Sequence, residues 1–185
     1  MFNFKRHQTT LSQEDWTVYR AAAQDVTYEH VYKAVHEMLG PNSSRRSCLF
    51  GKNTTDDGGG YHVPLYTWDD APEIVVQLRD QVQRITKSKP FDYCLVHLYA
   101  SGDSTIGWHN DGEALYAPVV SLSLGAARKF RFRPLGSTKG HTYQYILCSG
   151  DIVVMHDTCQ RKWEHGVPVE KGVREPRINI TFRYH

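Results

Sequence analysis

The spacing of the hydrophobic residues changes its period near the middle of the chain. Between residues 71 and 88, apolar side chains recur at intervals of one, three and four, which is the pattern of a helix with one buried face; they are Ile74, Val75, Leu78, Val82 and Ile85. Pro90 ends this pattern, because proline is not accommodated inside a helix. The segment therefore predicts one amphipathic helix.

The first part of the chain also has a helical pattern. Ser12 is followed by two acidic residues, which is typical of a helix start, and Gly40 with the proline after it marks an end. We expect helical structure between these two points, with a clear helix over residues 29–39. Two loops follow, at residues 41–47 and 51–60, and the second contains three consecutive glycines.

Beyond residue 90 the residue pattern is typical of β-strands. Short runs rich in β-branched and aromatic residues alternate with turn residues. We expect strands over residues 91–99, 119–124, 129–133, 142–147, 152–155 and 177–184. Two N-terminal helices that lead into a series of short strands predict an α+β fold, with an antiparallel sandwich or jelly roll as its core.

The composition narrows the class of protein. The 185 residues suffice for one domain with a sizeable core, and 40% hydrophobic against 23% charged residues fits a globular protein. The net charge of +2 excludes a strongly basic DNA-coating protein but permits a local basic patch. The four cysteines form no Cys-x-x-Cys pair, so we expect reduced thiols. With no apolar run long enough for a signal peptide or membrane span, we expect a soluble, intracellular monomer without membrane contact.

Ten histidines point to chemistry, because histidine is the commonest metal ligand among side chains. His109 and Asp111 share a face only on an extended backbone, and a strand end there would aim both at one point. His165 follows downstream as a third ligand. Two histidines and one carboxylate form the facial triad of non-haem Fe(II) oxygenases, which leaves positions open for co-substrate and oxygen. On its own, a His-x-Asp pair is a motif of low specificity.

A second polar set lies near the end of the sequence. In an extended backbone over residues 177–183, the apolar residues face one way and the polar residues face the other; the polar ones are Arg177, Asn179, Thr181 and Arg183. Arginine binds carboxylates through a planar, two-pronged fork. The run therefore predicts a dicarboxylate site, with the solvated face of an edge strand as the alternative.

Together these motifs resemble the AlkB family of Fe(II)/2-oxoglutarate-dependent dioxygenases. The resemblance covers residues 91–183, half of the chain, in FDYCLVHLYASGDSTIGWHNDGE, PVVSLSLGAARKFRF, SGDIVVM and EHGVPVEKGVREPRINITFR. It implies a double-stranded β-helix (jelly roll) core over residues 91–185. Residues 1–90 would supply two supporting helices and a substrate lid, within one compact domain.

The resemblance also implies roles for single residues. His109, Asp111 and His165 correspond to the ligands of Fe(II), with 2-oxoglutarate as co-substrate and O2 as oxidant. The residues that correspond to the co-substrate site are Tyr99, Arg177, Asn179, Thr181 and Arg183. The two arginines would clamp carboxylates, and Tyr99 would form a hydrogen bond. His97 stands where the family usually has asparagine, which changes that contact.

The family members most similar to this chain repair alkylated nucleic acid. They oxidise the N-methyl group of a base, and the hydroxymethyl product loses formaldehyde while 2-oxoglutarate becomes succinate and CO2. 1-Methyladenine and 3-methylcytosine are cationic, so a carboxylate at Glu113 would favour them over normal bases. Tyr61 corresponds to an aromatic residue of the lid, which would hold a flipped base. Trp108 either walls the pocket or packs in the core.

A basic face is also expected. Residues 128–133 alternate in type, so that Lys129, Arg131 and Arg133 share one side of a strand. Such a face would contact phosphates without reading sequence, unless it is merely solvated. Further basic residues would extend it, namely Arg45, Arg46, Lys87 and Lys89. The sequence contains no apolar wedge for opening a duplex, which favours single-stranded DNA or RNA as the partner.

Three functions stay open at this point. The first is a nucleic-acid N-demethylase of the AlkB type. The second is an Fe(II)/2-oxoglutarate hydroxylase that acts on a protein or a small molecule with the same triad. The third is a binding module that has kept the jelly roll and lost turnover. Glu113 and a basic rim favour the first, a neutral and narrow pocket would favour the second, and the complete ligand set argues against the third.

Overall fold

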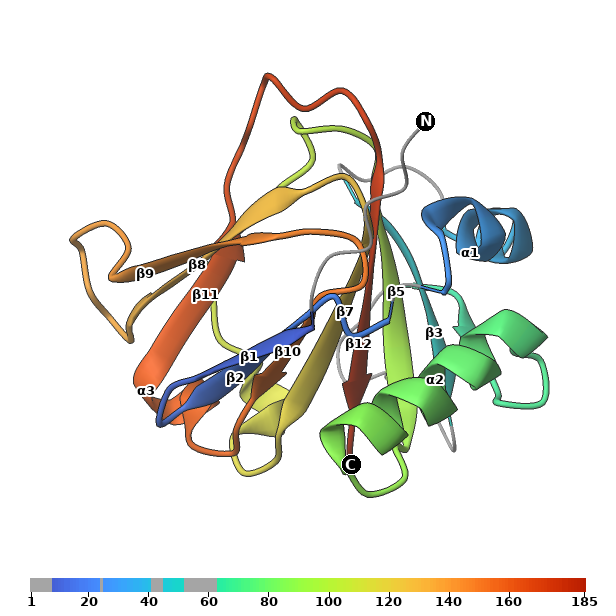
Figure 1. The fold of residues 1–185 in the computed structure, drawn as a ribbon, viewed down its shortest axis with the longest axis horizontal. Coiled ribbons are helices and arrows are strands. Elements are labelled where there is room, and N and C mark those ends of the chain that lie inside the picture. Colours follow the sequence, from blue (N-terminus) through green and yellow to red (C-terminus); the bar gives the residue numbers. More distant parts are fainter. Residues whose placement is uncertain (1–7, 24, 41–44, 52–62) are drawn as a thin grey trace.

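The computed structural model describes residues 8–23, 25–40, 45–51 and 63–185. These residues form three layers. Helices α1 (Tyr28–Val35) and α2 (Glu73–Thr86) lie against one face of an eight-stranded sheet, and a four-stranded sheet lies across its other face (Figure 1). The expected amphipathic helix at residues 71–88 is thus confirmed as α2.

Both sheets are almost wholly antiparallel. The large sheet has the spatial order β1 (Thr9–Ser12), β2 (Trp16–Arg20), β10 (Ile152–Met155), β7 (Val119–Gly125), β12 (Arg177–Arg183), β5 (Tyr93–Tyr99), β3 (Arg46–Gly51) and β4 (Leu65–Tyr66). The small sheet has the order β6 (Ile106–His109), β11 (Trp163–Val167), β8 (Arg128–Pro134) and β9 (Tyr143–Leu147). Within this set only the β3–β4 pair is parallel. Two facing sheets with helices on one side confirm the expected α+β fold with a jelly-roll core.

Strand β12 shows how the sequence builds two cores at once. Its apolar residues face the helices and join a core that includes Val75, Leu78, Ile178, Ile180 and Phe182. Its polar residues face the small sheet, where a second, aromatic core surrounds Phe132. Because β12 lies between β5 and β7 and all seven of its residues are buried, the alternative of a solvated edge strand is excluded.

The helical structure expected from Ser12 onward is wrong in its first part. That segment is a hairpin of β1 and β2, and in this region only α1 is helical. Trp16 stacks on Phe132 of the small sheet with 4.1 Å between ring centroids, and β2 pairs along its length with β10. The buried Asp151 then accepts hydrogen bonds from Arg20 and from the backbone of Ala21, both at 2.8 Å. These partners are distant in sequence, so tertiary packing overrides the local pattern.

Four other strands were not predicted. Of the loop expected at residues 41–47, residues 41–44 lie outside the described part, and Arg46 already begins β3, which pairs with β5 and with β4. Strands β6 and β11 bring the ligand motif into the small sheet. Four strands from the first 90 residues therefore complete the large sheet. The four cysteines are free thiols, three of them buried. Among the described helices, α2 is the longest with 14 residues, and none is long and apolar enough to cross a membrane.

Arg128 links the loop that follows β5 to the loop that precedes β12. Its side chain is 1% exposed, forms an ion pair with Glu170, and donates hydrogen bonds of 2.9 Å to the carbonyls of Ser101, Ser104 and Pro168. A buried guanidinium thus serves as a structural cross-link, because its fork satisfies carbonyls that no strand partner reaches.

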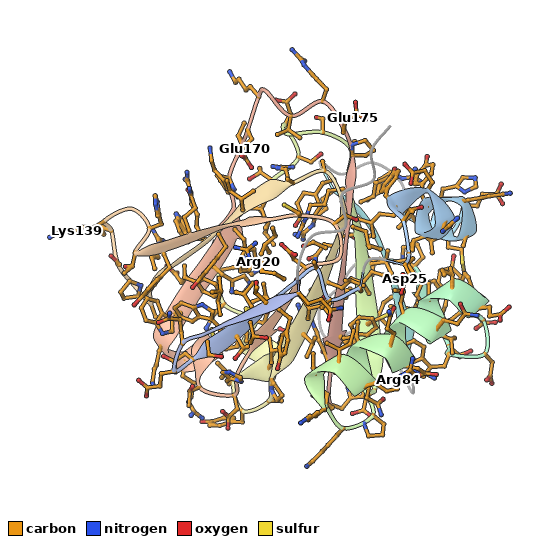
Figure 2. The ribbon with its side chains drawn as sticks, viewed as in Figure 1. Arg20, Asp25, Arg84, Lys139, Glu170 and Glu175 are labelled. Atoms are coloured by element: carbon orange, nitrogen blue, oxygen red, sulfur yellow. The ribbon has the colours of Figure 1, made fainter. Side chains whose placement is uncertain are left out.

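We predict that Arg128→Met lowers the free energy of unfolding by about 3–5 kcal/mol, because it breaks the ion pair with Glu170 and removes a donor from three carbonyls. Urea denaturation followed by circular dichroism measures the change. Arg84→Met is the matched control: Arg84 is an exposed residue of α2 (Figure 2), and its replacement should stay within about 0.5 kcal/mol of the parent. Equal midpoints for the two variants would contradict the cross-linking role.

Candidate active site

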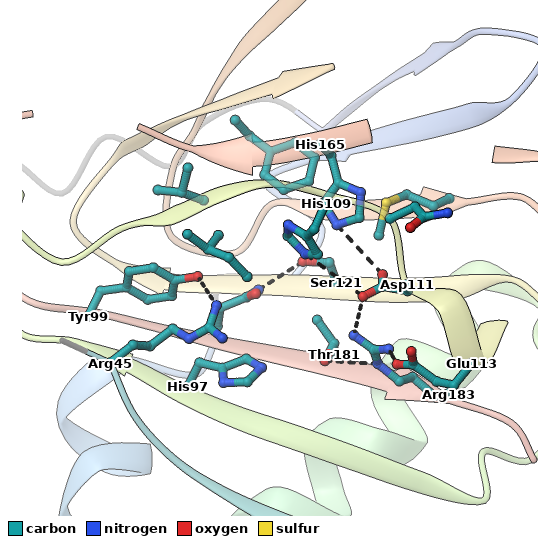
Figure 3. A pocket seen from close by; sticks show the side chains of 16 residues that line it. Arg45, His97, Tyr99, His109, Asp111, Glu113, Ser121, His165, Thr181 and Arg183 are labelled. Atoms are coloured by element: carbon teal, nitrogen blue, oxygen red, sulfur yellow. Dashed lines mark hydrogen bonds and ion pairs between the residues drawn. The ribbon is translucent and has the colours of Figure 1, made fainter. Parts of the chain in front are cut away.

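A pocket of about 200 Å³ lies between the two sheets (Figure 3). Many of the residues predicted from the sequence line it, namely His97, Tyr99, His109, Asp111, Glu113, His165, Asn179, Thr181 and Arg183. Arg177 does not line the pocket itself. It is buried beside the lining residue Tyr99, with its guanidinium carbon 5.0 Å from the centre of the Tyr99 ring. Tyr61 lies outside the described residues.

The three predicted metal ligands come together in this pocket. His109 ends β6, and His165 of β11 lies directly opposite it in the strand pairing, with 4.3 Å between the two ring centroids. Asp111 follows β6 and turns back toward both rings. Its carboxylate oxygens lie 3.6 Å from Nε2 of His165 and 3.9 Å from Nε2 of His109. The ligand atoms all lie within 4.8 Å of one another.

Both histidines turn Nε2 toward Asp111. Nδ1 of His109 lies 2.9 Å from the carbonyl oxygen of Gly107, and since a carbonyl only accepts, Nδ1 is the donor in this bond and Nε2 is the nitrogen that faces the metal site. Burial lowers the pKa of His165 to about 4, against the opposing effect of Asp111, so this imidazole is neutral at neutral pH. Its Nδ1 has no hydrogen-bond partner among the residues that the structure describes.

Asp111 is held as an ionised carboxylate. Burial acts to raise its pKa, but Arg183 and the two histidines outweigh that effect and lower the pKa to about 2. Nη2 of Arg183 donates to its Oδ1 at 2.9 Å, and a second nitrogen of Arg183 pairs with Glu113. The backbone N–H of Asp111 donates to Oε1 of Gln160 at 2.9 Å. Gln160, fully buried in the short helix α3 (Cys159–Lys162), carried no recognisable signal in the sequence.

Comparison with known proteins agrees with this arrangement. The family model described as the 2OG-Fe(II) oxygenase superfamily matches residues 5–183. DNA oxidative demethylase ALKBH2 of Bos taurus is 31% identical over 91% of this chain and 67% of its own length. Alpha-ketoglutarate-dependent dioxygenase alkB homolog 3 of Homo sapiens is 34% identical over 94% of this chain and 62% of its own length.

The chain belongs to the AlkB family of 2OG-Fe(II) oxygenases. The solved structure of OsALKBH1 has the same fold, with a TM-score of 0.67 and 20% identity over 96% of this chain and 100% of that one. The family fixes the cofactors of this oxygenase as Fe(II) and 2-oxoglutarate, with O2 as oxidant.

The residues of the AlkB-family pocket fit the metal. Metal bonds to histidine nitrogen and carboxylate oxygen are about 2.1 Å long, so two ligands of one ion lie at most about 4.2 Å apart. Asp111 meets this limit with each histidine, at 3.6 Å through one carboxylate oxygen and 3.9 Å through the other, and the ligand atoms of the whole set lie within 4.8 Å of one another. The neutral imidazole of His165 and the ionised carboxylate of Asp111 are also in the protonation states that metal binding requires.

The other end of the pocket is cationic. Three guanidinium carbons surround the ring of Tyr99, those of Arg177 at 5.0 Å, Arg45 at 5.7 Å and Arg128 at 5.8 Å from its centroid. Arg128 is satisfied by Glu170 and carbonyls, whereas Nε and Nη1 of the buried Arg177 have no partner within the described part of the chain. A buried cation with two unused donors fits a carboxylate of the co-substrate. Arg45 was expected only in a basic surface stripe.

Polar groups line the floor between the two ends. Nδ1 of His97 lies 2.6 Å from the hydroxyl of Ser47. Burial, reinforced by Arg45 and Arg183, holds the pKa of His97 well below its usual value, so its ring is neutral. Nδ2 of Asn179 donates to the hydroxyl of Ser121 at 2.8 Å and to a backbone carbonyl. The residue at the family's asparagine position is therefore a neutral hydrogen-bonding group that faces the pocket.

The basic strand face expected at residues 129–133 lies outside the pocket and is largely neutralised. The buried Phe130 and Phe132 face inward, so the basic residues of β8 face outward. Lys129 lies 3.5 Å from Glu170, and Arg133 lies 2.7 Å from Glu164. Arg131 donates to the neutral Gln144. Trp108 packs on this outer side too, with the guanidinium carbon of Arg133 4.5 Å from its ring, and it does not wall the pocket.

We predict that Asp111→Asn weakens Co(II) binding by at least 100-fold, since even the loss of a residue that merely orients a ligand costs about 10–100-fold. Titration calorimetry with Co(II) measures the affinity, and circular dichroism verifies the fold. Asp103→Asn, which removes an exposed carboxylate from the neighbouring loop, is the matched control and should bind Co(II) like the parent. Equal affinity in both variants would show that the metal binds elsewhere.

Proposed function

We propose that this oxygenase oxidatively removes methyl groups from N-alkylated bases of nucleic acid, 1-methyladenine and 3-methylcytosine among them, with release of formaldehyde, CO2 and succinate. The observation that carries the proposal is the cluster of His109, Asp111 and His165 beside Glu113 in one pocket. The relatives named DNA oxidative demethylase ALKBH2 support the choice of reaction and of nucleic acid.

In this proposal Fe(II) is held at the histidine end of the pocket, and 2-oxoglutarate extends from there toward the arginines around Tyr99. His109, Asp111 and His165 bind Fe(II), which together with 2-oxoglutarate supplies the activation of O2 that oxidises the methyl carbon. Arg177 receives the carboxylate of 2-oxoglutarate that lies farther from the metal, and Tyr99 donates its hydroxyl proton to the same molecule. Arg183 acts mainly by keeping Asp111 charged and oriented, since its guanidinium pairs with Asp111 and Glu113 and donates to Thr181.

The remaining predicted co-substrate residues line the pocket between its two ends with polar groups. Asn179 and Thr181 stand beside the two arginines on β12, and His97 faces them from the neighbouring strand β5. A neutral imidazole at His97 can donate one hydrogen bond to a carboxylate without adding charge. It therefore replaces the hydrogen bond of an asparagine.

We predict that Arg177→Lys raises the KM for 2-oxoglutarate by more than about tenfold, because lysine keeps the charge and loses the planar fork. Co(II) affinity should stay at the parental value, since Arg177 contacts none of the three ligands. Initial rates over a series of 2-oxoglutarate concentrations give the KM. Arg84→Lys, on the exposed side of α2, is the control. A KM that matches the control would exclude Arg177 as the clamp.

The substrate base enters beside Glu113 in this proposal. Glu113 belongs to the turn Gly112–Ala114 at the rim of the pocket, and its side chain is 28% exposed while it pairs with Arg183. A carboxylate in this position favours a cationic base over a neutral one, because the interaction is only partly screened by solvent. Tyr61 would add a stacking surface from the lid.

Single-stranded nucleic acid is the proposed partner. The sequence before Gly51 lacks the apolar wedge that fills a duplex after a base is flipped, and extruding a base from a single strand costs less. The outer face of β8, with Lys129, Arg131 and Trp108, is proposed as a site of phosphate and base contacts away from the chemistry. Its partial neutralisation by Glu164 and Glu170 leaves Arg131 as its main positive charge.

The alternative is a hydroxylase for a protein or a small molecule, which would use the same triad. Both functions are tested together by supplying Fe(II), 2-oxoglutarate and oligonucleotides that carry one methylated base, as single strands and duplexes of DNA and of RNA. We expect formaldehyde and the mass of the unmodified base, mainly from single strands. Asp111→Asn is the inactive control. Succinate formation in the parent that no oligonucleotide stimulates would favour the hydroxylase.

Glu113→Gln should lower kcat/KM for 3-methylcytosine by about tenfold and that for the neutral 3-methylthymine by much less, because the replacement removes charge and keeps shape. The ratio between the two bases is the informative number, since an indirect effect through Arg183 would reduce both rates alike. Mass spectrometry of paired reactions in one oligonucleotide context gives this ratio. An unchanged ratio would remove Glu113 from base recognition.

A further inference from the structure

A second, larger groove lies outside the space between the sheets. It has a volume of about 580 Å³ and runs between the C-terminal end of α2 and the neighbouring strands β2 and β10. Figure 1 shows the end of the chain beside this end of α2, and the hydroxyl of Tyr184 donates to the carbonyl of Lys89 at 3.1 Å. The groove uses none of the metal or co-substrate residues.

The groove combines aromatic rings with positive charge. Its aromatic walls are Tyr19, Tyr116 and Tyr184, and Tyr116 is 78% exposed with the guanidinium carbon of Arg161 4.8 Å from its ring. Rings that are open to solvent on one face are the platforms on which unpaired bases stack. A fully apolar groove for a helix or a lipid would lack the polar edges that these three hydroxyls provide.

Two lysines at the rim of the groove are not engaged in ion pairs. Lys87 and Lys89 are exposed, and no carboxylate of the described residues lies within ion-pair distance of either. Asp92, the acid that lines the groove, accepts a hydrogen bond from the backbone of His185. This differs from the outer face of β8, where two of three basic residues are paired with glutamates. Two positive charges at the end of α2 are therefore available to a polyanion.

Lys87 also has an unusual backbone. It caps α2 in the left-handed conformation, with φ of 55°, a position that glycine adopts without strain. Replacement by glycine therefore removes the charge while the helix end keeps its geometry. This gives a variant that separates binding from folding.

The groove lies close to the pocket along the chain. Asp111 and Glu113 line the pocket, and Tyr116 to Pro118, only a few residues later, line the groove. On β12, Arg183 lies in the pocket and the next two residues lie in the groove. The ring of His185 also stacks on Tyr93 with 4.8 Å between centroids, and Tyr93 pairs with Arg183.

From this placement we propose that the groove binds the single-stranded DNA that flanks the modified base, with bases stacked on Tyr116 and phosphates on Lys87 and Lys89. The proposal rests on the proposed function and names the surface that holds the substrate strand. A duplex fits less well, because its bases are already stacked on each other and offer no face to Tyr116.

The test measures binding of unmodified DNA, which needs no catalysis. Fluorescence anisotropy gives Kd for single strands of about 15 nucleotides over a range of salt concentrations. For Lys87→Gly/Lys89→Gln we expect a Kd raised about tenfold and a salt slope reduced by about 1.4, from about 0.7 for each lost phosphate contact. Tyr116→Ala should raise Kd about 5- to 150-fold, as expected for the loss of base stacking, and Tyr116→Phe should bind like the parent.

The matched control is Lys171→Gln/Arg174→Gln. It makes the same change of charge in an exposed loop that also carries Glu170 and Glu175, at the other end of the molecule from Arg84 of α2 (Figure 2). A groove variant that binds with the Kd and salt slope of this control would overturn the proposal. Duplex DNA that binds more tightly than single strands, with the same dependence on the lysines, would also overturn it.

A length series separates this proposal from the proposed function. For a trinucleotide centred on 3-methylcytosine, the groove variants should demethylate at the parental rate, because so short a strand does not reach past the pocket. An equal defect on the trinucleotide would assign the lysines to the pocket and refute the groove. If the parent demethylates no oligonucleotide but the groove variants still lose DNA affinity, the proposed function fails and the binding surface stands.

Discussion

The site depends on one ion pair that joins the two sheets. Arg183 belongs to the large sheet and Asp111 follows a strand of the small one, and both side chains are nearly buried. Burying two charges is costly, and such a pair often adds little to stability. Here its effect is on chemistry, because it helps to keep a carboxylate ionised between two histidines. Burial acts to raise the pKa of Asp111 toward the protonated acid, which is a poor metal ligand, and Arg183 provides the largest of the opposing effects.

Strand β12 makes the two ends of the pocket chemically different. Alternation along β12 puts Arg177 and Arg183 on one face, at opposite ends, with Asn179 and Thr181 between them. Arg183 is engaged with carboxylates of the protein, whereas Arg177 keeps two donors for an outside partner. On the proposed function, an elongated dianion would therefore be oriented by the difference between two arginines that the sequence shows as equivalent. The difference arises because acidic residues flank only one of them.

The sequence predicts features that are local and periodic. The stripe of α2 and the alternation of β12 follow from spacing alone, and the structure has both. The hairpin of β1 and β2 was missed because Trp16 is placed by Phe132, more than a hundred residues away. The basic face of β8 was predicted correctly as a face, but its charge was not, because Glu164 and Glu170 approach it from other elements. Gln160 lies in no motif, and only the fold brings it to Asp111.

The large sheet buries both of its faces, and this explains why two binding surfaces can meet at one end of it. Side chains that alternate along β12 must enter the pocket on one face and the helix layer on the other. At the end of the strand, Arg183 stays buried in the pocket on one side, and Tyr184 lies beside the end of α2 on the other. On the binding proposal, a strand of nucleic acid would cross this edge with one base in the pocket and a more distant flanking base on Tyr116. The end of β12 would then set the path of the flanking nucleotides between the two surfaces.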